Sequence, residues 1–342
     1  MYVHIVTTDM GWGGALMDGI GKALAENGHS IGWRAHGPYT HVEEKCDAII
    51  TIGMAPVTMG LIEDCKRKNV QLFLITDGFL KRHGDRLTER YWAVGRNSFH
   101  AYGRPVDFLV PGDRWERLGV EMQPWRNEGK YILVAHQYTS VPLYNIDKRP
   151  YFERAYEEIR KYTDRPFKIR KHPLDKGRTA TPEGFAESFS VGEQAESFEE
   201  ALRDAWCVLT YDSNAALEAI LRGVPAFTLG KCLADPAANK DLSRIENPLR
   251  PDRQQWAHWI AYAQWSGAEL RDYAAWRVLL DNEYQRVDEP AHENDLRRSA
   301  SPPGAMDGQA LPAAPVHPQA DTAKSNKKTA NKSPRPAKTA AA

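Results

Sequence analysis

The sequence predicts an α/β protein of two Rossmann-like, doubly wound domains that face each other across a cleft, followed by a disordered tail. Short apolar segments alternate with helical segments in both halves of the chain, a pattern typical of parallel sheets covered on both faces. The length of 342 residues exceeds the usual size of one domain. We expect an N-terminal domain over 1–125, a C-terminal domain over 126–285 and a tail over 286–342.

Strands of the first half are expected at 1–6, 31–35, 47–52 and 71–75, with a helix at 57–68. A Gly-rich loop after the first strand leads into another helix, but its glycines miss the G-x-G-x-x-G spacing of a dinucleotide site. Asp9 and Gly13 in this loop are candidate acceptor contacts, because glycine lets a ligand approach the backbone closely. A tight strand-to-helix turn is the alternative interpretation.

The fourth strand ends in T-D-G-F-L. An acid at the carboxyl end of such a strand can act as a general base toward a hydroxyl, which makes Asp77 a candidate catalytic residue. A plain Asp-Gly turn is the alternative. Segment 81–104 is rich in cations and rings, which predicts a polyanion-binding face with Lys81, Arg82 and Arg96 as candidates. A half-buried strand beside solvated arginines explains the same composition.

In the second half, a Pro/Gly-containing crossover precedes expected strands at 131–135, 167–170 and 206–210 and another from 224. Helices are expected at 151–162, at 198–205 and directly after the third of these strands. Two Trp-rich segments, 253–265 and 269–282, have the spacing of helix faces packed on the body.

Polar residues follow three of these strands. Asp212, Ser213 and Asn214 are good N-cap residues, and a helix N-terminus at the carboxyl end of a parallel strand is a favourable anion site. Lys171 and His172 follow another strand and can donate hydrogen bonds to phosphate oxygens. Gln137 follows a third. We therefore expect these strand ends to hold the phosphate or diphosphate of a nucleotide-sugar.

Charge and cysteine content limit the classes of partner, metal site and location that this sequence allows. Lys+Arg and Asp+Glu both total 45, but the chain after residue 321 carries six cations and no acid, so residues 1–321 sum to −6. The basic tail is a candidate contact for double-stranded DNA. The four cysteines lack zinc-like spacing and are expected to be buried free thiols. No apolar run approaches the ~20 residues of a membrane span, and no signal peptide is evident, so we expect a cytoplasmic protein.

The ordered motifs D-G-F-L (77–80), H-P (172–173) and S-N followed by E-A-x-x-x-G-x-P (213–225) resemble those of glycosyltransferases with the two-domain GT-B fold. D-G-F-L is similar to an element of capsule Kdo transferases, and an acidic D/E-G motif with H-P resembles bacterial sialyltransferases. An uncharacterised phage-encoded group is closer still, through D-R-W (113–115), I-R-x-H-P (169–173), Y-x-S-N (211–214) and Q-W (264–265). The resemblance extends over about 75–265.

This resemblance implies residue roles. Asp77 would be the base, and His172 would hold the donor phosphate opposite Ser213 and Asn214. Glu218 matches an acid placed on the donor ribose. Retaining members usually carry a second Glu eight residues earlier, where this chain has Thr210, so an inverting reaction is implied.

No D-x-D run is present, so we expect a metal-independent reaction with no cofactor beyond the nucleotide-sugar; a UDP-type and a CMP-type donor both remain open. The resemblance to the phage-encoded group implies that the protein acts in the host cytoplasm. It also implies hydroxymethylated pyrimidines of phage DNA as acceptors. The alternatives are a capsular or surface polysaccharide acceptor, and a non-catalytic DNA-binding phage protein on a transferase scaffold.

Overall fold

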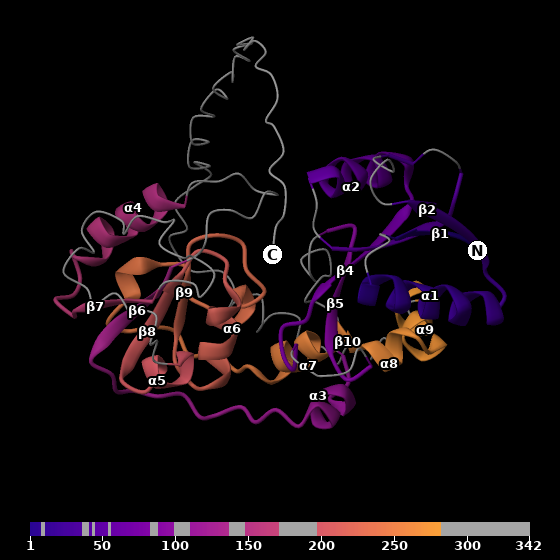
Figure 1. Ribbon diagram of the computed structural model, residues 1–342. Coiled ribbons are helices and arrows are strands. Elements are labelled where there is room, and N and C mark those ends of the chain that lie inside the picture. Colours follow the sequence, from indigo (N-terminus) through magenta and orange to yellow (C-terminus); the bar gives the residue numbers. More distant parts are fainter. Residues whose placement is uncertain are drawn as a thin grey trace, which may run out of the picture. The chain divides into compact units, whose positions relative to one another are not determined.

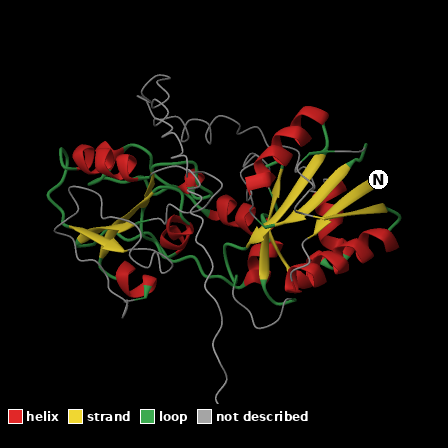
Figure 2. Ribbon diagram, turned by 45° about the horizontal axis from the view of Figure 1, so that its top comes forward, coloured by secondary structure: helices red, strands yellow, loops and turns green. Residues whose placement is uncertain are grey.

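A computed structural model shows two β-sheets, each packed against helices (Figures 1 and 2). It describes residues 1–7, 11–35, 41–42, 45–53, 56–82, 88–98, 110–136, 148–170 and 197–281. The expected tail over 286–342 lies outside this part. The predicted α/β class with two largely parallel sheets is confirmed.

The first sheet has six strands in the order β10-β5-β4-β3-β1-β2. The strands are β1 (Tyr2–Thr7), β2 (Ser30–Ala35), β3 (Ala48–Ile52), β4 (Gln71–Asp77), β5 (Tyr91–Arg96) and β10 (Gln264–Ser266). The first four are parallel to one another, whereas β5 runs antiparallel to β4 and β10 antiparallel to β5. An antiparallel edge therefore closes a parallel sheet.

Helices cover both faces of this sheet. Val3 and Ile5 of β1 pack in one apolar cluster with α1 (Gly11–Glu26), while Val6 packs in another with α2 (Pro56–Lys68). β3 is buried along its whole length, as expected for a strand covered on both sides. The short helices α8 (Gly267–Leu270) and α9 (Tyr273–Asp281) contact α1.

The second sheet is wholly parallel, with the order β7-β6-β8-β9. Its strands are β6 (Tyr131–Ala135), β7 (Phe167–Arg170), β8 (Ala205–Thr210) and β9 (Ala226–Thr228). α4 (Arg149–Ile159) packs on one face and α6 (Asn214–Leu221) on the other, since their apolar residues belong to different clusters. α5 (Phe198–Leu202) packs on the same side as α6. The remaining elements are α3 (Asp113–Leu118), η1 (Asp235–Ala237), η2 (Leu242–Arg244) and α7 (Gln254–Tyr262).

Two local expectations were wrong. The helix α1 already begins at Gly11, so Gly13 lies buried in its first turns rather than in an open loop. The helix expected over 253–265 ends at Tyr262, and 264–266 form β10 instead. Backbone pairing with β5 outweighs helical continuation there. This segment, grouped by sequence with the second half, thus adds a strand to the first sheet; the domain boundaries stay a prediction.

All four cysteines are buried and free, as expected. Burial raises the pKa of the Cys65 thiol to about 12, which makes it a poor nucleophile at neutral pH. Among the described helices, none is both long enough and apolar enough to cross a bilayer.

Candidate functional site

The turn after β4 carries the D-G-F-L motif in a closely fixed conformation. The Asp77 side chain is 66% exposed and forms an ion pair with Arg90. Gly78 donates its N–H to the carbonyl of Tyr91 (3.2 Å), and a Cβ at this position would lie 2.5 Å from that same oxygen. Only glycine fits so close to the neighbouring strand. The chain therefore turns at Asp77-Gly78, and the turn leaves the Asp77 carboxylate at the surface.

Phe79 and Leu80 turn back into the protein. Their side chains are 2% and 9% exposed, and both of their N–H groups donate to the Oε1 atom of Gln264 at 2.9 Å. Lys81 then adopts a left-handed backbone conformation with φ of 49°, which is uncommon for a residue with a side chain. The turn thus ends with Lys81 exposed and Arg82 half-buried beside it.

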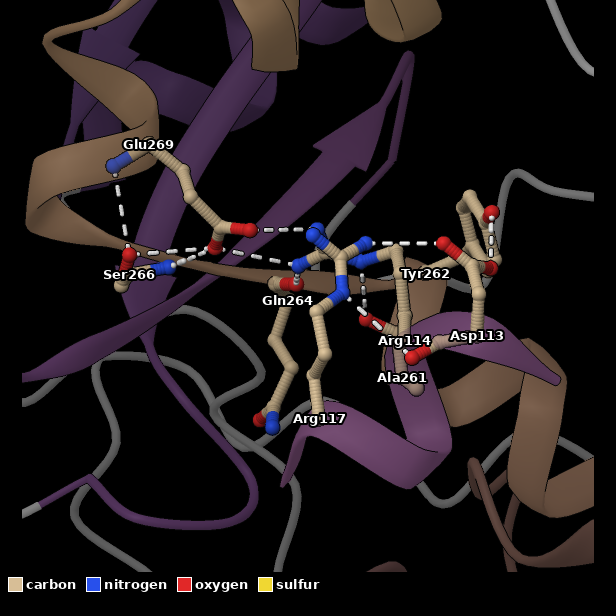
Figure 3. A network of polar contacts seen from close by, with 8 residues as sticks. All are labelled: Asp113, Arg114, Arg117, Ala261, Tyr262, Gln264, Ser266 and Glu269. Carbon is tan, nitrogen blue, oxygen red and sulfur yellow. Dashed lines mark hydrogen bonds and ion pairs between the residues drawn. The ribbon is translucent and has the colours of Figure 1, made fainter. Parts of the chain in front are cut away.

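Gln264 is in turn held by Arg114, the arginine of the D-R-W motif (Figure 3). The buried Arg114 guanidinium donates to the backbone oxygens of Gln264 (2.9 Å) and Ala261 (3.2 Å). It also pairs with Glu269 at 2.6 Å and lies 3.6 Å from the ring centroid of Trp265. Two motifs that resemblance singled out, D-R-W and Q-W, therefore meet in one network behind the D-G-F-L turn.

The junction of β8 and α6 has the predicted cap. The Ser213 side chain accepts from the N–H of Ala215 (3.2 Å), and Asn214 is the first residue of α6. Asp212 forms an ion pair with Lys148 at 2.9 Å. The Lys148 side chain is only 7% exposed and lies 5.0 Å from the Tyr211 ring centroid. A buried cation therefore sits beside the start of α6, at the carboxyl end of the sheet.

A pocket of about 1380 Å³ joins parts of both halves. Its described lining comes from 79–82, 120–126, 197–203 and 218–222. Of the predicted site residues, Lys81, Arg82 and Glu218 belong to this lining, while Asp77, Asp212, Ser213 and Asn214 do not.

Five cations and three acids line this pocket: Lys81, Arg82, Arg126, Arg203 and Arg222, with Glu121, Glu199 and Glu218. Arg222 lies 3.9 Å from Glu218 and 3.7 Å from Glu199, so these are loose ion pairs. Arg126 donates to the carbonyls of Leu202 (2.6 Å) and Arg203 (2.7 Å). The excess of positive charge suits an anionic ligand.

The crossover segment is bound to the end of α6. Gln123 donates its N–H to the carbonyl of Leu221 (2.8 Å), and Arg126 donates its N–H to that of Gly223 (2.8 Å). Gly223 has φ of +75°, and a Cβ there would lie 1.9 Å from the carbonyl oxygen of Pro124. The glycine of the E-A-x-x-x-G-x-P motif is thus required by this contact, which fixes one wall of the pocket.

The candidate acceptor residues do not form one continuous face. Arg96 ends the antiparallel strand β5 and pairs with Phe73 of β4, so it lies at the opposite end of these strands from the D-G-F-L turn. It lines a separate pocket with Lys45 and Lys68. Tyr91 and Trp92 belong to β5, as the alternative interpretation of this segment had it.

Four predicted site residues, Asp9, Gln137, Lys171 and His172, lie outside the described residues. Sequence reasoning missed Lys148, Arg126, Arg203 and Arg222, because single cations in loops and at helix ends carry no motif. It also assigned no role to Arg114 or Gln264. Within the described part of the chain, no group of three or more His, Cys, Asp and Glu residues is placed to hold a metal ion.

No family model matches the chain, and no curated protein matches its sequence. The chain is similar to solved structures at low sequence identity. The β-Kdo 2,7 transferase of KpsC from Thermosulfurimonas dismutans has a TM-score of 0.48 and 13% identity, covering 78% of this chain and 97% of that one. The β-Kdo 2,4 transferase of KpsC from the same organism has 0.45 and 14%, covering 76% and 91%. The UDP-GlcNAc 2-epimerase of Methanocaldococcus jannaschii has 0.26 and 12%, covering 67% and 83%.

Proposed function

We propose that this protein is a glycosyltransferase that moves a sugar from a nucleotide-sugar to a hydroxyl acceptor. The observation that carries the proposal is the shared pocket. Lys81 and Arg82, which follow the D-G-F-L turn, line it from the first half, and Glu218 on α6 lines it from the second. A two-substrate transfer needs such a site, because donor and acceptor must be held against each other.

The second half is proposed to bind the donor. α6 begins at the carboxyl end of β8 with a serine cap, and the positive end of its dipole favours a phosphate there. Lys148, paired with Asp212, places a buried ammonium group beside this helix start. Glu218 lies one turn further along α6 and faces the same pocket as the cations, where it would contact the donor ribose. His172 is proposed to donate to the leaving phosphate.

The reaction is proposed to be an inverting displacement without a metal ion. Asp77 would take the proton of the acceptor hydroxyl as the oxygen attacks the anomeric carbon. The bond to the donor phosphate breaks in the same step, and the phosphate leaves with the electron pair. Fixed hydrogen-bond donors stabilise that leaving group, and such donors contribute mainly by preorganisation.

The proposed acceptor is a hydroxymethylated pyrimidine in phage DNA. The cations of the pocket and the +6 tail after residue 321 support an acceptor with phosphates. The second candidate is a capsular or surface polysaccharide, which suits the net charge of −6 over residues 1–321. A protein that binds DNA without catalysis is the third.

The test is transfer from a panel of nucleotide-sugars, followed by mass spectrometry of DNA nucleosides and of glycan acceptors. We expect release of the nucleotide with one donor, and a loss of about 10²–10³-fold in kcat for His172→Ala. His41→Ala alters an exposed histidine and serves as the control. Absence of release with every donor would refute the transferase proposal.

The DNA arm is measured separately. We expect duplex affinity to fall with salt and to fall further when residues 322–342 are removed. Sugar transfer to a glycan acceptor without any modified nucleoside would refute the DNA acceptor and support the polysaccharide. Duplex binding without release of nucleotide would support the non-catalytic protein.

A further inference from the structure

We propose that Gln264 is a positioning residue for transfer: its side-chain oxygen holds the turn over 77–82 in the conformation that presents this turn to the pocket. The functional part of this inference rests on the glycosyltransferase function proposed above. The contact itself is independent of that function. Gln264 does not line the pocket, so it acts through the turn rather than on a substrate.

The first step concerns hydrogen bonding. One Oε1 atom accepts from two successive amides, those of Phe79 and Leu80, both at 2.9 Å and both buried. Neither amide is placed to join the sheet, because the chain has already turned away from β4 at Gly78. A buried N–H without an acceptor is strongly unfavourable. Gln264 therefore supplies the acceptor that lets these two residues turn inward.

The second step concerns strain. Lys81 has φ of 49°, and Gly78 sits so close to Tyr91 that a Cβ would lie 2.5 Å from its carbonyl oxygen. Such a turn persists only when surrounding contacts fix it. On one side the contact is the backbone of β5, and on the other it is the side chain of Gln264. Loss of either contact should release the turn.

The third step is the rigidity of Gln264. Its backbone pairs with Ala93 in β5, and its carbonyl accepts from Arg114 at 2.9 Å. Arg114 is fixed in turn by the ion pair with Glu269 and by stacking on Trp265, as Figure 3 shows for the polar contacts. The acceptor oxygen is thus held by a network that spans the D-R-W and Q-W motifs.

The fourth step is the choice of glutamine. Gln264 is fully buried, and its Nε2 atom has no hydrogen-bond partner among the described residues. The oxygen is therefore the working atom of the amide. An uncharged carbonyl supplies that acceptor without the cost of burying a carboxylate. Gln264→Met removes the acceptor at similar volume, whereas Gln264→Glu keeps a carboxyl oxygen in the same place.

The experiment combines amide hydrogen exchange with kinetics. In Gln264→Met we expect the Phe79 and Leu80 amides to exchange on the order of tenfold faster or more, as the loss of two net hydrogen bonds implies. Amides of Ile49 and Ile50, in the buried strand β3, report global unfolding, and their exchange should be accelerated less than that of Phe79 and Leu80. We expect kcat of transfer to fall at least as much, with KM for the nucleotide-sugar little altered. Gln264→Glu keeps an acceptor oxygen but buries a carboxyl group, so we expect it to recover only part of both.

The outcomes distinguish the role of Gln264 in holding the turn from its role in sugar transfer. Unchanged exchange at Phe79 and Leu80 in Gln264→Met would overturn the proposal. Faster exchange with normal kcat would overturn the positioning role and leave a purely structural contact. If wild-type protein shows no transfer at all, the proposed function fails, while the exchange result still decides on the turn. Should Gln264→Met not fold, Arg114→Lys is the second variant: it loses the paired contact to Glu269, and unchanged exchange and kcat there would equally overturn the proposal.

Discussion

The turn after β4 and the turn after β8 both leave the carboxyl end of a parallel strand, but different parts of the chain hold them. Ser213 caps α6 through an amide only two residues away. Phe79 and Leu80 are instead held by Gln264, 185 and 184 residues further along. The two turns therefore fail in different ways. A local cap is lost by a local substitution, whereas the turn after β4 depends on an element made much later in the chain.

The two turns also differ in the kind of group that fixes them. At the start of α6 the fixed groups are polar and local, with Asp212 paired to the buried Lys148. At the turn after β4 the fixed groups are backbone atoms pressed against β5, and the one acid, Asp77, is exposed. The proposed phosphate site therefore depends on local polar groups, whereas the proposed base stands on a turn that distant parts of the chain hold in place.

Gly78→Ala tests the closeness of the turn to β5 and should have the largest effect on stability. The added Cβ meets a backbone oxygen at 2.5 Å, which cannot rotate away, so we expect a loss of about 1–3 kcal/mol in the free energy of unfolding. Urea unfolding measures it. Gly13→Ala, with nothing within 4 Å of the new Cβ, is the matched control and should gain about 0.4–1 kcal/mol. Equal effects of both substitutions would show that the contact with β5 is not restrictive.

Ser213→Ala tests the local cap. Removal of a serine N-cap costs about 1 kcal/mol, and the change should also weaken the thermal stabilisation given by a nucleoside diphosphate, because the start of α6 becomes less ordered. Differential scanning fluorimetry with and without the nucleotide reports both. Ser266→Ala removes a serine cap of the same kind from α8, in its capping box and outside the pocket lining, and should lower stability without selectively reducing the nucleotide shift. A nucleotide shift that survives Ser213→Ala intact would place the phosphate elsewhere.

Low pH should weaken the Glu269–Arg114 ion pair behind Gln264, with a smaller effect on stability than the two substitutions above. Burial would raise the pKa of Glu269, but hydrogen bonds and the charge of Arg114 outweigh it and hold that pKa below its ordinary value. The unfolded chain therefore takes up the proton first, so this stabilisation is complete above about pH 4.3, the ordinary glutamate value, and is lost as pH falls through the lower folded value. Urea unfolding of wild type and Glu269→Gln should differ at pH 7, and the difference should shrink as the pH falls below about 4.3. A constant difference across this range would exclude the carboxylate as the source.

The sequence predicted well those features that depend on nearby residues. The parallel strands of both sheets and the serine cap of α6 follow from short patterns and lie where expected. By contrast, β10 is only three residues long and exists because it pairs with β5; no local periodicity distinguishes it from the end of a helix. Gln264 and Arg114 were visible as parts of motifs, but their role depends on contacts over more than 140 residues.

The candidate site was predicted in part. The sequence indicated Glu218 and the cations Lys81 and Arg82, which line one pocket. It also grouped Arg96 with those cations, because composition does not reveal that β5 reverses the direction of the chain and carries Arg96 to the other end of the sheet. Lys148 was missed because it matters through its burial beside Asp212. A single lysine outside any motif gives no sequence signal of such burial.

The late position of β10 has a consequence for biosynthesis. A nascent chain that has emerged only as far as residue 125 lacks the strand that pairs with β5, including Trp265 opposite Trp92. Its first sheet then ends in an open backbone edge, which invites association with other chains. Completion of this sheet therefore waits until residues 264–266 have left the ribosome, by which time the second sheet has been fully synthesised.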